Sequence, residues 1–131
     1  MYGLGHGAWT KAIAHLQPKQ IFALDVVAPE YAGFWEYVGQ RSNVSHVVAT
    51  DFSLSAIPDM SLDYFFSFGC FCHLKPDMCI AYINSLAARM KPEAHGLEQE
   101  STDAGAWFHF GVDRACESLC SAGFKIIESD M

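Results

Sequence analysis

The chain has 131 residues, of which 51% are hydrophobic and 14% aromatic. This length and composition predict one folded domain with a single core and exclude an intrinsically disordered chain. Eight lysines and arginines stand against fifteen acids, which gives a formal net charge of −7 without any basic run. Because nucleic-acid binding requires clustered cations, nucleic acid is disfavoured as a partner.

Targeting and redox features point to one compartment. The sequence contains neither a signal peptide nor an apolar run long enough to cross a bilayer, so no membrane partner is expected. Five cysteines, an odd number at irregular spacing, fit reduced thiols better than a disulfide framework. We therefore expect a cytoplasmic protein.

Three glycines, Gly3, Gly5 and Gly7, stand at alternate positions near the N-terminus. Such a run makes the backbone turn tightly and keeps side chains away from a ligand lying on it, commonly a nucleotide. A frayed, glycine-rich terminus is the competing interpretation. The pattern that follows predicts a helix closed by Pro18. Its expected apolar face consists of Trp9, Ala12, Ile13 and Leu16.

A strand and a second helix are predicted next. Residues 20–27 form a nearly continuous apolar run with one charge, Asp25, near the carboxyl end. Such a run is typical of a strand buried on both faces. Pro29 then opens a helix that Gly39 ends. The apolar stripe expected on this helix consists of Tyr31, Phe34, Trp35 and Val38.

Two further strands, over residues 44–49 and 62–68, are followed by a long helix that begins at Pro76 and ends before Lys91. The predicted apolar face of this helix consists of Cys79, Ile80, Tyr82, Ile83, Leu86 and Met90.

The C-terminal part has a less regular pattern. Gly96 to Asp103 predict an acidic loop, since their acids make a buried strand improbable. A last helix is predicted over about residues 111–122, with Gly123 as its cap, and a final strand over residues 124–128.

Helices and strands that alternate through short connections predict an α/β fold, Rossmann-like, with a mostly parallel sheet and helices on both faces. Ligands of such sheets bind outside the carboxyl ends of the strands. Asp25 lies about twenty residues beyond the glycines, where its carboxylate would accept hydrogen bonds from both hydroxyls of a ribose. A solvated loop acid is the alternative. Asp51 offers a carboxylate for an adenine amino group, beside the aromatic wall of Phe52.

Two cofactors fit this pattern. Gly3, Gly5 and Ala8 satisfy the loose dinucleotide fingerprint, whereas Gly3, Gly5 and Gly7 fit a loop for S-adenosylmethionine. The segments GLGHGAWTKAI, LDVV, ATDF and DYFFSFGCFCHL together favour the second. On these segments the chain resembles the class I S-adenosylmethionine-dependent methyltransferases, and within them it is similar to small-molecule or sugar O-methyltransferases. The resemblance covers nearly the whole chain.

The resemblance implies a set of cofactor contacts and a reaction. Asp25 falls on the ribose-binding acid, Asp51 and Phe52 fall on the adenine-binding pair, and residues 67–69 line the methionine side. The implied cofactor-binding residues are Gly3, Gly5, Gly7, Asp25, Asp51, Phe52, Ser67, Phe68 and Gly69. The implied reaction moves the sulfonium methyl group to a small-molecule acceptor, with a hydroxyl as one candidate.

His73 is the one candidate for a catalytic base, because it follows the third strand on the side where substrate would enter. A histidine that merely ties the loop to the next helix is the alternative.

Residues 107–110, Trp-Phe-His-Phe, form either an aromatic lip over the acceptor or core packing. A zinc site is disfavoured, because a single residue separates Cys70 from Cys72, whereas zinc sites favour cysteine pairs separated by two residues.

The chain departs from the family in two places. Only Met1 and Tyr2 precede Gly3, so the central first strand of the family order 3-2-1-4-5 is missing, and the fifth strand is doubtful. Direct pairing of the flanking strands, a strand supplied by another chain in a homo-oligomer, or truncation at the N-terminus would each account for the missing strand. We favour truncation. A nicotinamide-dependent reductase and a non-catalytic remnant that acts as an interaction module remain the rival functions.

Overall fold

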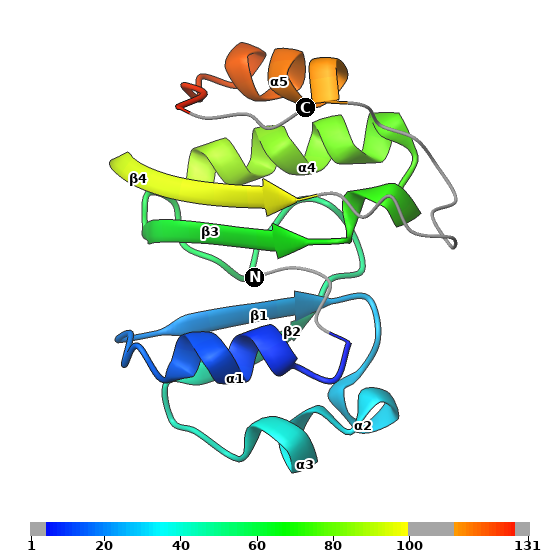
Figure 1. The fold of residues 1–131 in the computed structure, drawn as a ribbon, viewed down its shortest axis with the longest axis vertical. Coiled ribbons are helices and arrows are strands. Elements are labelled where there is room, and N and C mark those ends of the chain that lie inside the picture. Colours follow the sequence, from blue (N-terminus) through cyan, green and yellow to red (C-terminus); the bar gives the residue numbers. More distant parts are fainter. Residues whose placement is uncertain (1–4, 100–111, 128–131) are drawn as a thin grey trace. The chain divides into compact units, whose positions relative to one another are not determined.

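The structure is a computed structural model that describes residues 5–99 and 112–127. The chain divides into two compact units, Met1–Thr50 and Asp51–Met131. The described part of the first unit contains α1 (Ala8–Ala14), β1 (Ile21–Asp25), α2 (Pro29–Ala32), α3 (Phe34–Val38) and β2 (Val44–Val48) (Figure 1). The described part of the second contains β3 (Leu62–Phe68), the 3-10 helix η1 (Phe71–His73), α4 (Pro76–Arg89), β4 (Met90–Gln99) and α5 (Val112–Ser121).

The first unit is built on a parallel pair of strands. β1 pairs with β2 in a register that sets Ile21 opposite Val44 and Asp25 opposite Val48. Alternate residues of a strand point to the same face, so Ile21 and Ala23 share one face of β1. The core on this face consists of Ala14, Ile21, Ala23, Phe34, Val38 and Val44. Both predicted strands are thereby confirmed, and helices α1 and α3 supply the cover.

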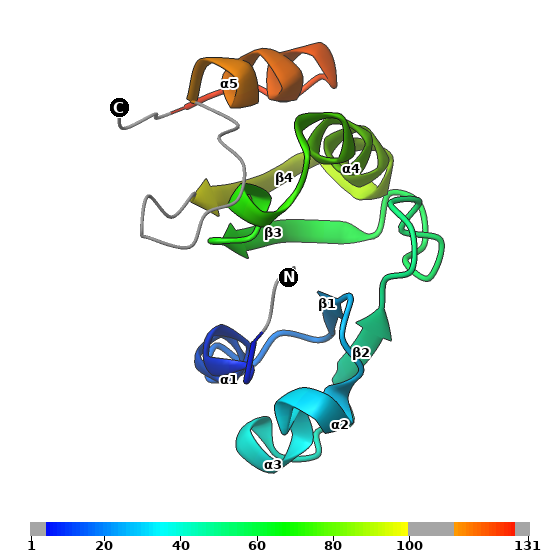
Figure 2. The ribbon, with the colours of Figure 1, turned by 90° about the vertical axis from the view of Figure 1, so that its right-hand side faces the viewer.

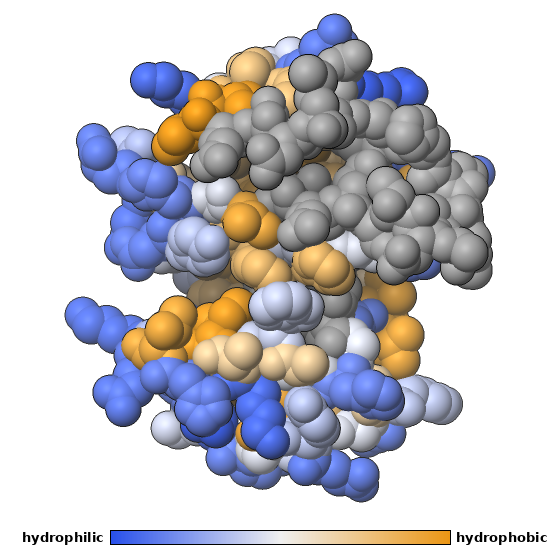
Figure 3. Space-filling view, viewed as in Figure 1, coloured by the Kyte–Doolittle hydropathy of each residue, from blue (hydrophilic) through white to orange (hydrophobic). Residues whose placement is uncertain are grey.

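Helix α1 forms where it was predicted but buries a different face. Its buried residues are Thr10 and Ala14, and of the predicted apolar stripe only Ile13 packs, partly buried, against the core. Leu16 lies beyond the end of the helix and is 81% exposed. Figure 3 shows hydrophobic surface in the region where α1 ends. The predicted face was wrong for its ends, because the small Ala14 is the residue of α1 that enters the core, whereas Trp9 is 46% exposed.

The second predicted helix is two short helices. Gly33 adopts a left-handed backbone conformation, with φ of 60°, between α2 and α3. A left-handed residue ends a helix and redirects the chain. Phe34 and Val38 of α3 are buried as predicted, whereas Tyr31 of α2 is 88% exposed and lies outside the expected stripe.

The second unit is also built on a parallel pair. β3 has the predicted bounds and pairs with β4. Helix α4 covers one face of this pair through the contact between Tyr82 and Phe65, whose ring centroids are 6.2 Å apart, and α5 lies against α4 (Figure 2). The buried residues of α4 are Cys79, Tyr82, Ile83 and Leu86, which confirms most of its predicted apolar face. The prediction was wrong for Met90, which begins β4 because the helix ends at Arg89, and Ile80 is only partly buried.

Strand β4 corrects the prediction of an acidic loop over Gly96 to Gln99, whereas Glu100 to Asp103 lie outside the described residues. Gly96 pairs with Phe65, and the ladder continues to the pair formed by Gln99 and Phe68. The register shifts near the start of β4, where Pro92 has no N–H for the ladder. Within the described residues β4 pairs only with β3, and Leu97 is 43% exposed. The prediction was wrong because it assumed a strand buried on both faces, whereas an edge strand accommodates polar residues.

The predicted final strand is absent from residues 124–127, and Glu128 lies outside the described residues. The backbone N–H of Phe124 instead donates to the carbonyl of Leu119 at 3.0 Å, and that of Gly123 donates to Cys120 at 3.0 Å. Gly123 has a φ of 100°, the left-handed conformation that ends a helix. The amide of Phe124 is therefore used in capping α5.

The mostly parallel α/β fold class is confirmed. The two strand pairs are those that the order 3-2-1-4-5 predicts on either side of its central strand. Residues 1–4 lie outside the described part of the chain, as do the aromatic residues 107–110, whose predicted role as lip or core stays a prediction. The missing central strand, the truncation and the single-domain organisation therefore stay predictions.

Candidate functional site

The glycine turn is the first element of the candidate site. Gly5 and Gly7 both have left-handed backbone conformations, with φ of 51° and 91°, and Gly7 begins α1. Gly3 lies outside the described residues. A Cβ atom on Gly7 would lie 2.5 Å from Cγ2 of Val38 and 2.8 Å from Cε2 of Phe34. Packing against α3 therefore requires a glycine at this position. The sequence analysis had attributed this glycine to a ligand lying on the backbone.

Gly5 differs from Gly7 in its surroundings. A Cβ atom built on Gly5 would meet nothing within 4 Å. The backbone here is open, as the approach of a ligand to a glycine turn requires. Of the two described glycines, Gly5 is therefore the one whose environment fits the predicted contact.

Asp25 ends β1 and is half-buried. Its backbone carbonyl accepts the N–H of Ala49 at 2.7 Å, which extends the ladder between β1 and β2. One carboxylate oxygen, Oδ1, accepts the N–H of Val27 at 3.2 Å. The ladder and this turn together hold the carboxylate at the carboxyl end of a parallel strand, where α/β proteins bind ligands.

Asp51 carries the second carboxylate and is exposed, beside the half-buried Phe52. Its Oδ1 accepts two hydrogen bonds from Ser53, one from the hydroxyl at 2.7 Å and one from the backbone N–H at 2.9 Å. These bonds, the hydroxyl first, lower the pKa of Asp51 below its usual value of 3.8. These bonds favour the ionised carboxylate and fix it within its own turn.

The end of β3 carries three more predicted residues. Ser67 is fully buried and, by the alternation of the strand, lies on the same face as Phe65, which α4 covers. Its hydroxyl has no hydrogen-bond partner among the described residues. Phe68 is exposed on the opposite face, and Gly69 follows with φ of 61°. A contact between a cofactor and the Ser67 hydroxyl therefore stays a prediction.

His73, the candidate base, lies in η1 and is exposed. Its backbone N–H donates to the carbonyl of Cys70 at 3.0 Å. The thiol of Cys79 on α4 bonds to the carbonyls of Phe71 and Leu74 at 3.7 and 3.9 Å, which ties η1 to the helix. Cys79 thus serves as a buried structural residue. Among the described residues, no group of three or more His, Cys, Asp and Glu side chains is arranged to hold a metal ion.

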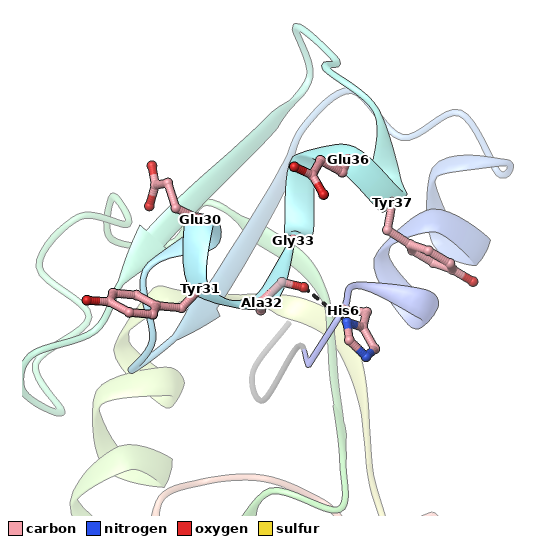
Figure 4. A pocket seen from close by; sticks show the side chains of 7 residues that line it. All are labelled: His6, Glu30, Tyr31, Ala32, Gly33, Glu36 and Tyr37. Atoms are coloured by element: carbon pink, nitrogen blue, oxygen red, sulfur yellow. Dashed lines mark hydrogen bonds between the residues drawn. The ribbon is translucent and has the colours of Figure 1, made fainter.

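A shallow hollow of about 560 Å³ lies beside the glycine turn in the first unit (Figure 4). The hollow is lined by His6, Glu30, Tyr31, Ala32, Gly33, Glu36 and Tyr37. A hydrogen bond joins Nδ1 of His6 and the carbonyl of Ala32, 3.0 Å apart, and the ammonium of Lys11 lies 4.6 Å from the ring centroid of Tyr37. The hollow includes none of the predicted cofactor-binding residues.

The methyltransferase domain family matches the chain over residues 1–95. This chain belongs to that family. The matched region includes every predicted site residue, from the glycine turn to His73. A search among curated proteins found no match.

Membership in the methyltransferase domain family confirms the coarser part of the resemblance. The family lies within the class I methyltransferases, which typically use S-adenosylmethionine for methyl transfer. None of the helices in the described part of this methyltransferase is long and apolar enough to cross a membrane.

The sequence analysis did not single out His46, which lies close to the candidate ribose-binding acid. His46 of β2 lies opposite Ala23, with its ring 4.8 Å from that of Phe34. Burial lowers the pKa of His46, and the charges of Asp25 and Glu30 oppose this shift. Its Nδ1 is buried without a partner among the described residues. The alternation in residues 44–48 places His46 on the inner face with Val44, which is the sequence signal that would have found it.

Proposed function

We propose that this methyltransferase moves a methyl group from S-adenosylmethionine to a hydroxyl of a small-molecule acceptor. The observation that supports the proposal is that a member of this family carries two carboxylates in ordered turns, Asp25 at the end of β1 and Asp51 three residues after β2. Both stand at or just beyond the carboxyl end of a parallel strand, where the ligands of α/β sheets bind.

The residues present fit the cofactor by their chemistry. In this proposal Asp25 accepts hydrogen bonds from the ribose hydroxyls, and Asp51 accepts one from the adenine amino group. Phe52 supplies an aromatic contact beside Asp51. The backbone at Gly3, Gly5 and Gly7 and the residues Ser67, Phe68 and Gly69 line the methionine side. When bound, S-adenosylmethionine supplies an electrophilic methyl group on a sulfonium ion.

His73 takes the proton of the acceptor hydroxyl in this proposal, because an imidazole is the common general base near neutral pH. Its exposure in η1 leaves room for an acceptor to approach. Orientation of the reactants and exclusion of water supply much of the rate enhancement in such a transfer, so loss of His73 slows the reaction without abolishing it.

The proposed partner is a small molecule. The formal charge of −7 without a basic run disfavours nucleic acid. The odd cysteine count at irregular spacing supports a reducing, cytoplasmic location. The proposal also includes a homo-oligomer, in which a second copy of the chain supplies the central strand.

The decisive experiment is calorimetric titration of the purified chain with S-adenosylhomocysteine and, separately, with NADH. We expect binding of S-adenosylhomocysteine alone. Asp25→Ala should weaken this binding by about 1.5–3 kcal/mol, the range for hydrogen bonds to a charged group, while the fold remains intact.

Asp63→Ala is the matched control. Asp63 is an acid of a parallel strand, but it stands near the start of β3 and forms an exposed ion pair with Lys91 at 2.8 Å. This change should leave the affinity as it is. Preferential binding of NADH would favour the reductase, and an oligomer that binds neither ligand would favour the non-catalytic remnant.

A second assay tests the proposed base. A set of small acceptors that carry hydroxyl, amine or carboxyl groups is offered together with isotopically labelled S-adenosylmethionine. His73→Gln should lower the rate with the hydroxyl acceptor and should leave the affinity for S-adenosylhomocysteine unchanged. An unchanged rate would remove His73 from the reaction.

A further inference from the structure

Residues 51–61 form a loop that is tied to the end of α4 by side-chain and backbone bonds. Near the end of the loop, the backbone N–H groups of Met60 and Ser61 donate to the carbonyls of Ala88 and Arg89, at 3.1 and 2.9 Å. Near its start, the loop has no strand or helix of its own, and Leu54 adopts a left-handed backbone conformation with φ of 53° while its side chain is buried. A non-glycine residue in this conformation persists only where its surroundings hold it.

The side chain of Arg89 fixes the backbone at Ser53 and Leu54. Its Nε donates to the carbonyl of Leu54 at 3.1 Å, and its Nη2 donates to the carbonyl of Ser53 at 3.0 Å. Its third nitrogen, Nη1, forms an ion pair with Asp59. The Arg89 side chain as a whole is 17% exposed, and the planar fork of its guanidinium reaches three acceptors at once, which a lysine ammonium on a flexible stem does not reproduce.

Ser53 joins Arg89 to the candidate adenine-binding acid. The carbonyl of Ser53 accepts from Arg89, while its N–H and hydroxyl both donate to Oδ1 of Asp51. One residue thus links the guanidinium of α4 to the carboxylate. The carbonyl of Ser53 belongs to the peptide shared with Leu54, and its N–H belongs to the peptide shared with Phe52. Release of the carbonyl therefore leaves the backbone of Ser53 free to rotate next to the turn at Asp51.

We propose that Arg89 is a positioning residue, which holds Ser53 and thereby presents the Asp51 carboxylate in its ligand-binding turn. This inference rests on the proposed function for the role of Asp51 toward the adenine, although the positioning itself is independent of any ligand. Arg89 touches neither substrate nor cofactor in this account.

The test compares Arg89→Met with Asp59→Asn in the full chain. Arg89→Met keeps most of the stem and removes all three contacts, whereas Asp59→Asn removes the ion pair and keeps the two bonds from Arg89 to the loop carbonyls. The readout is the titration of the Asp51 carboxyl by NMR in the ligand-free protein, together with the affinity for S-adenosylhomocysteine.

In Arg89→Met we expect the pKa of Asp51 to rise toward its ordinary value and the affinity to fall about three- to tenfold. In Asp59→Asn the pKa of Asp51 and the affinity for S-adenosylhomocysteine should both stay near their values in the unchanged protein. Should Arg89→Met fail to fold, Arg89→Lys keeps the charge and is expected to shift both quantities in the same direction by less.

Two outcomes separate this inference from the proposed function. If Arg89→Met lowers the melting temperature but leaves the titration of Asp51 unchanged, Arg89 is only structural and the inference is overturned. If Arg89→Met shifts the titration while Asp51→Asn leaves the affinity for S-adenosylhomocysteine unchanged, the positioning is supported and the assignment of Asp51 to the cofactor fails.

Discussion

Asp25 in the first unit and Asp51 in the second form the same kind of turn, in which a carboxylate oxygen accepts the N–H of the residue two positions later. The two turns are stabilised differently. Asp25 is the last residue of β1, so the ladder with β2 places its backbone. Asp51 lies outside the strands and depends on the hydroxyl of Ser53 and, through Ser53, on Arg89.

This difference shows how a binding acid is positioned with and without a strand. A residue within a parallel ladder inherits its place from backbone bonds that nearly any sequence can form. A residue beyond the ladder needs specific side chains, and those can come from a distant part of the chain. We therefore expect the first unit to be sensitive to packing and the second to single polar contacts.

Gly7→Ala should have the largest effect and would break the first unit. The added Cβ would lie 2.5 Å from Val38 and 2.8 Å from Phe34, in a backbone conformation with φ of 91°. Overpacking and strain together should cost about 2–4 kcal/mol. Chemical denaturation measures this loss. Gly5→Ala, where nothing lies within 4 Å, is the control and should cost about 1 kcal/mol. Equal losses at the two glycines would contradict the packing explanation.

Ser67→Ala should act in the opposite direction in the second unit. The Ser67 hydroxyl is fully buried and has no partner among the described residues. Removing an unsatisfied buried group should raise the free energy of unfolding by up to about 1 kcal/mol. Thermal unfolding followed by circular dichroism measures the change. Ser85→Ala, on the half-buried side of α4, serves as a control for serine removal. A clear loss of stability in Ser67→Ala would show that the hydroxyl has a partner.

The pH dependence of stability should be smaller and should originate in the first unit. Burial holds the pKa of His46 below its ordinary value of 6.5. Near this pH the folded state therefore binds fewer protons than the unfolded state. The contribution of neutral His46 to the free energy of unfolding is complete above pH 6.5 and is lost as the pH falls through the lower pKa of the folded state. Denaturation at several pH values should show this slope in the unchanged protein, and His46→Phe should remove it. A slope that persists in His46→Phe would assign it to another group.

Ser53→Ala should change stability least of all. Ser53 is exposed, and surface substitutions usually shift stability by no more than about 0.5 kcal/mol. Loss of its hydroxyl should nevertheless raise the pKa of Asp51, because that hydroxyl is the first cause of the lowered value. Carboxyl titration by NMR measures the shift. Ser55→Ala, two residues further along the same loop, should leave the titration unchanged; an equal shift in both variants would argue against the specific bond.

The amino-acid sequence by itself predicted the strands that the structure places at residues 21–25, 44–48 and 62–68, the long helix α4, and the acids at or just beyond the ends of the first two strands. These features are readable because a strand buried within a parallel sheet and a helix with one buried face each leave a local apolar pattern. The family resemblance rested on the same segments, and the match over residues 1–95 confirms it at the level of the methyltransferase domain.

Only the tertiary structure decided which face of α1 is buried, that Gly33 divides the second helix, and that Gly96 to Gln99 continue a strand. The same holds for Gly7, whose missing side chain serves the contact with α3, and for Arg89, which stands 36 residues beyond the Ser53 that it contacts. The physical reason is common to all of them. A local pattern records how apolar a segment is, whereas the partner that covers it, pairs with it or bonds to it is set by residues far away in the chain.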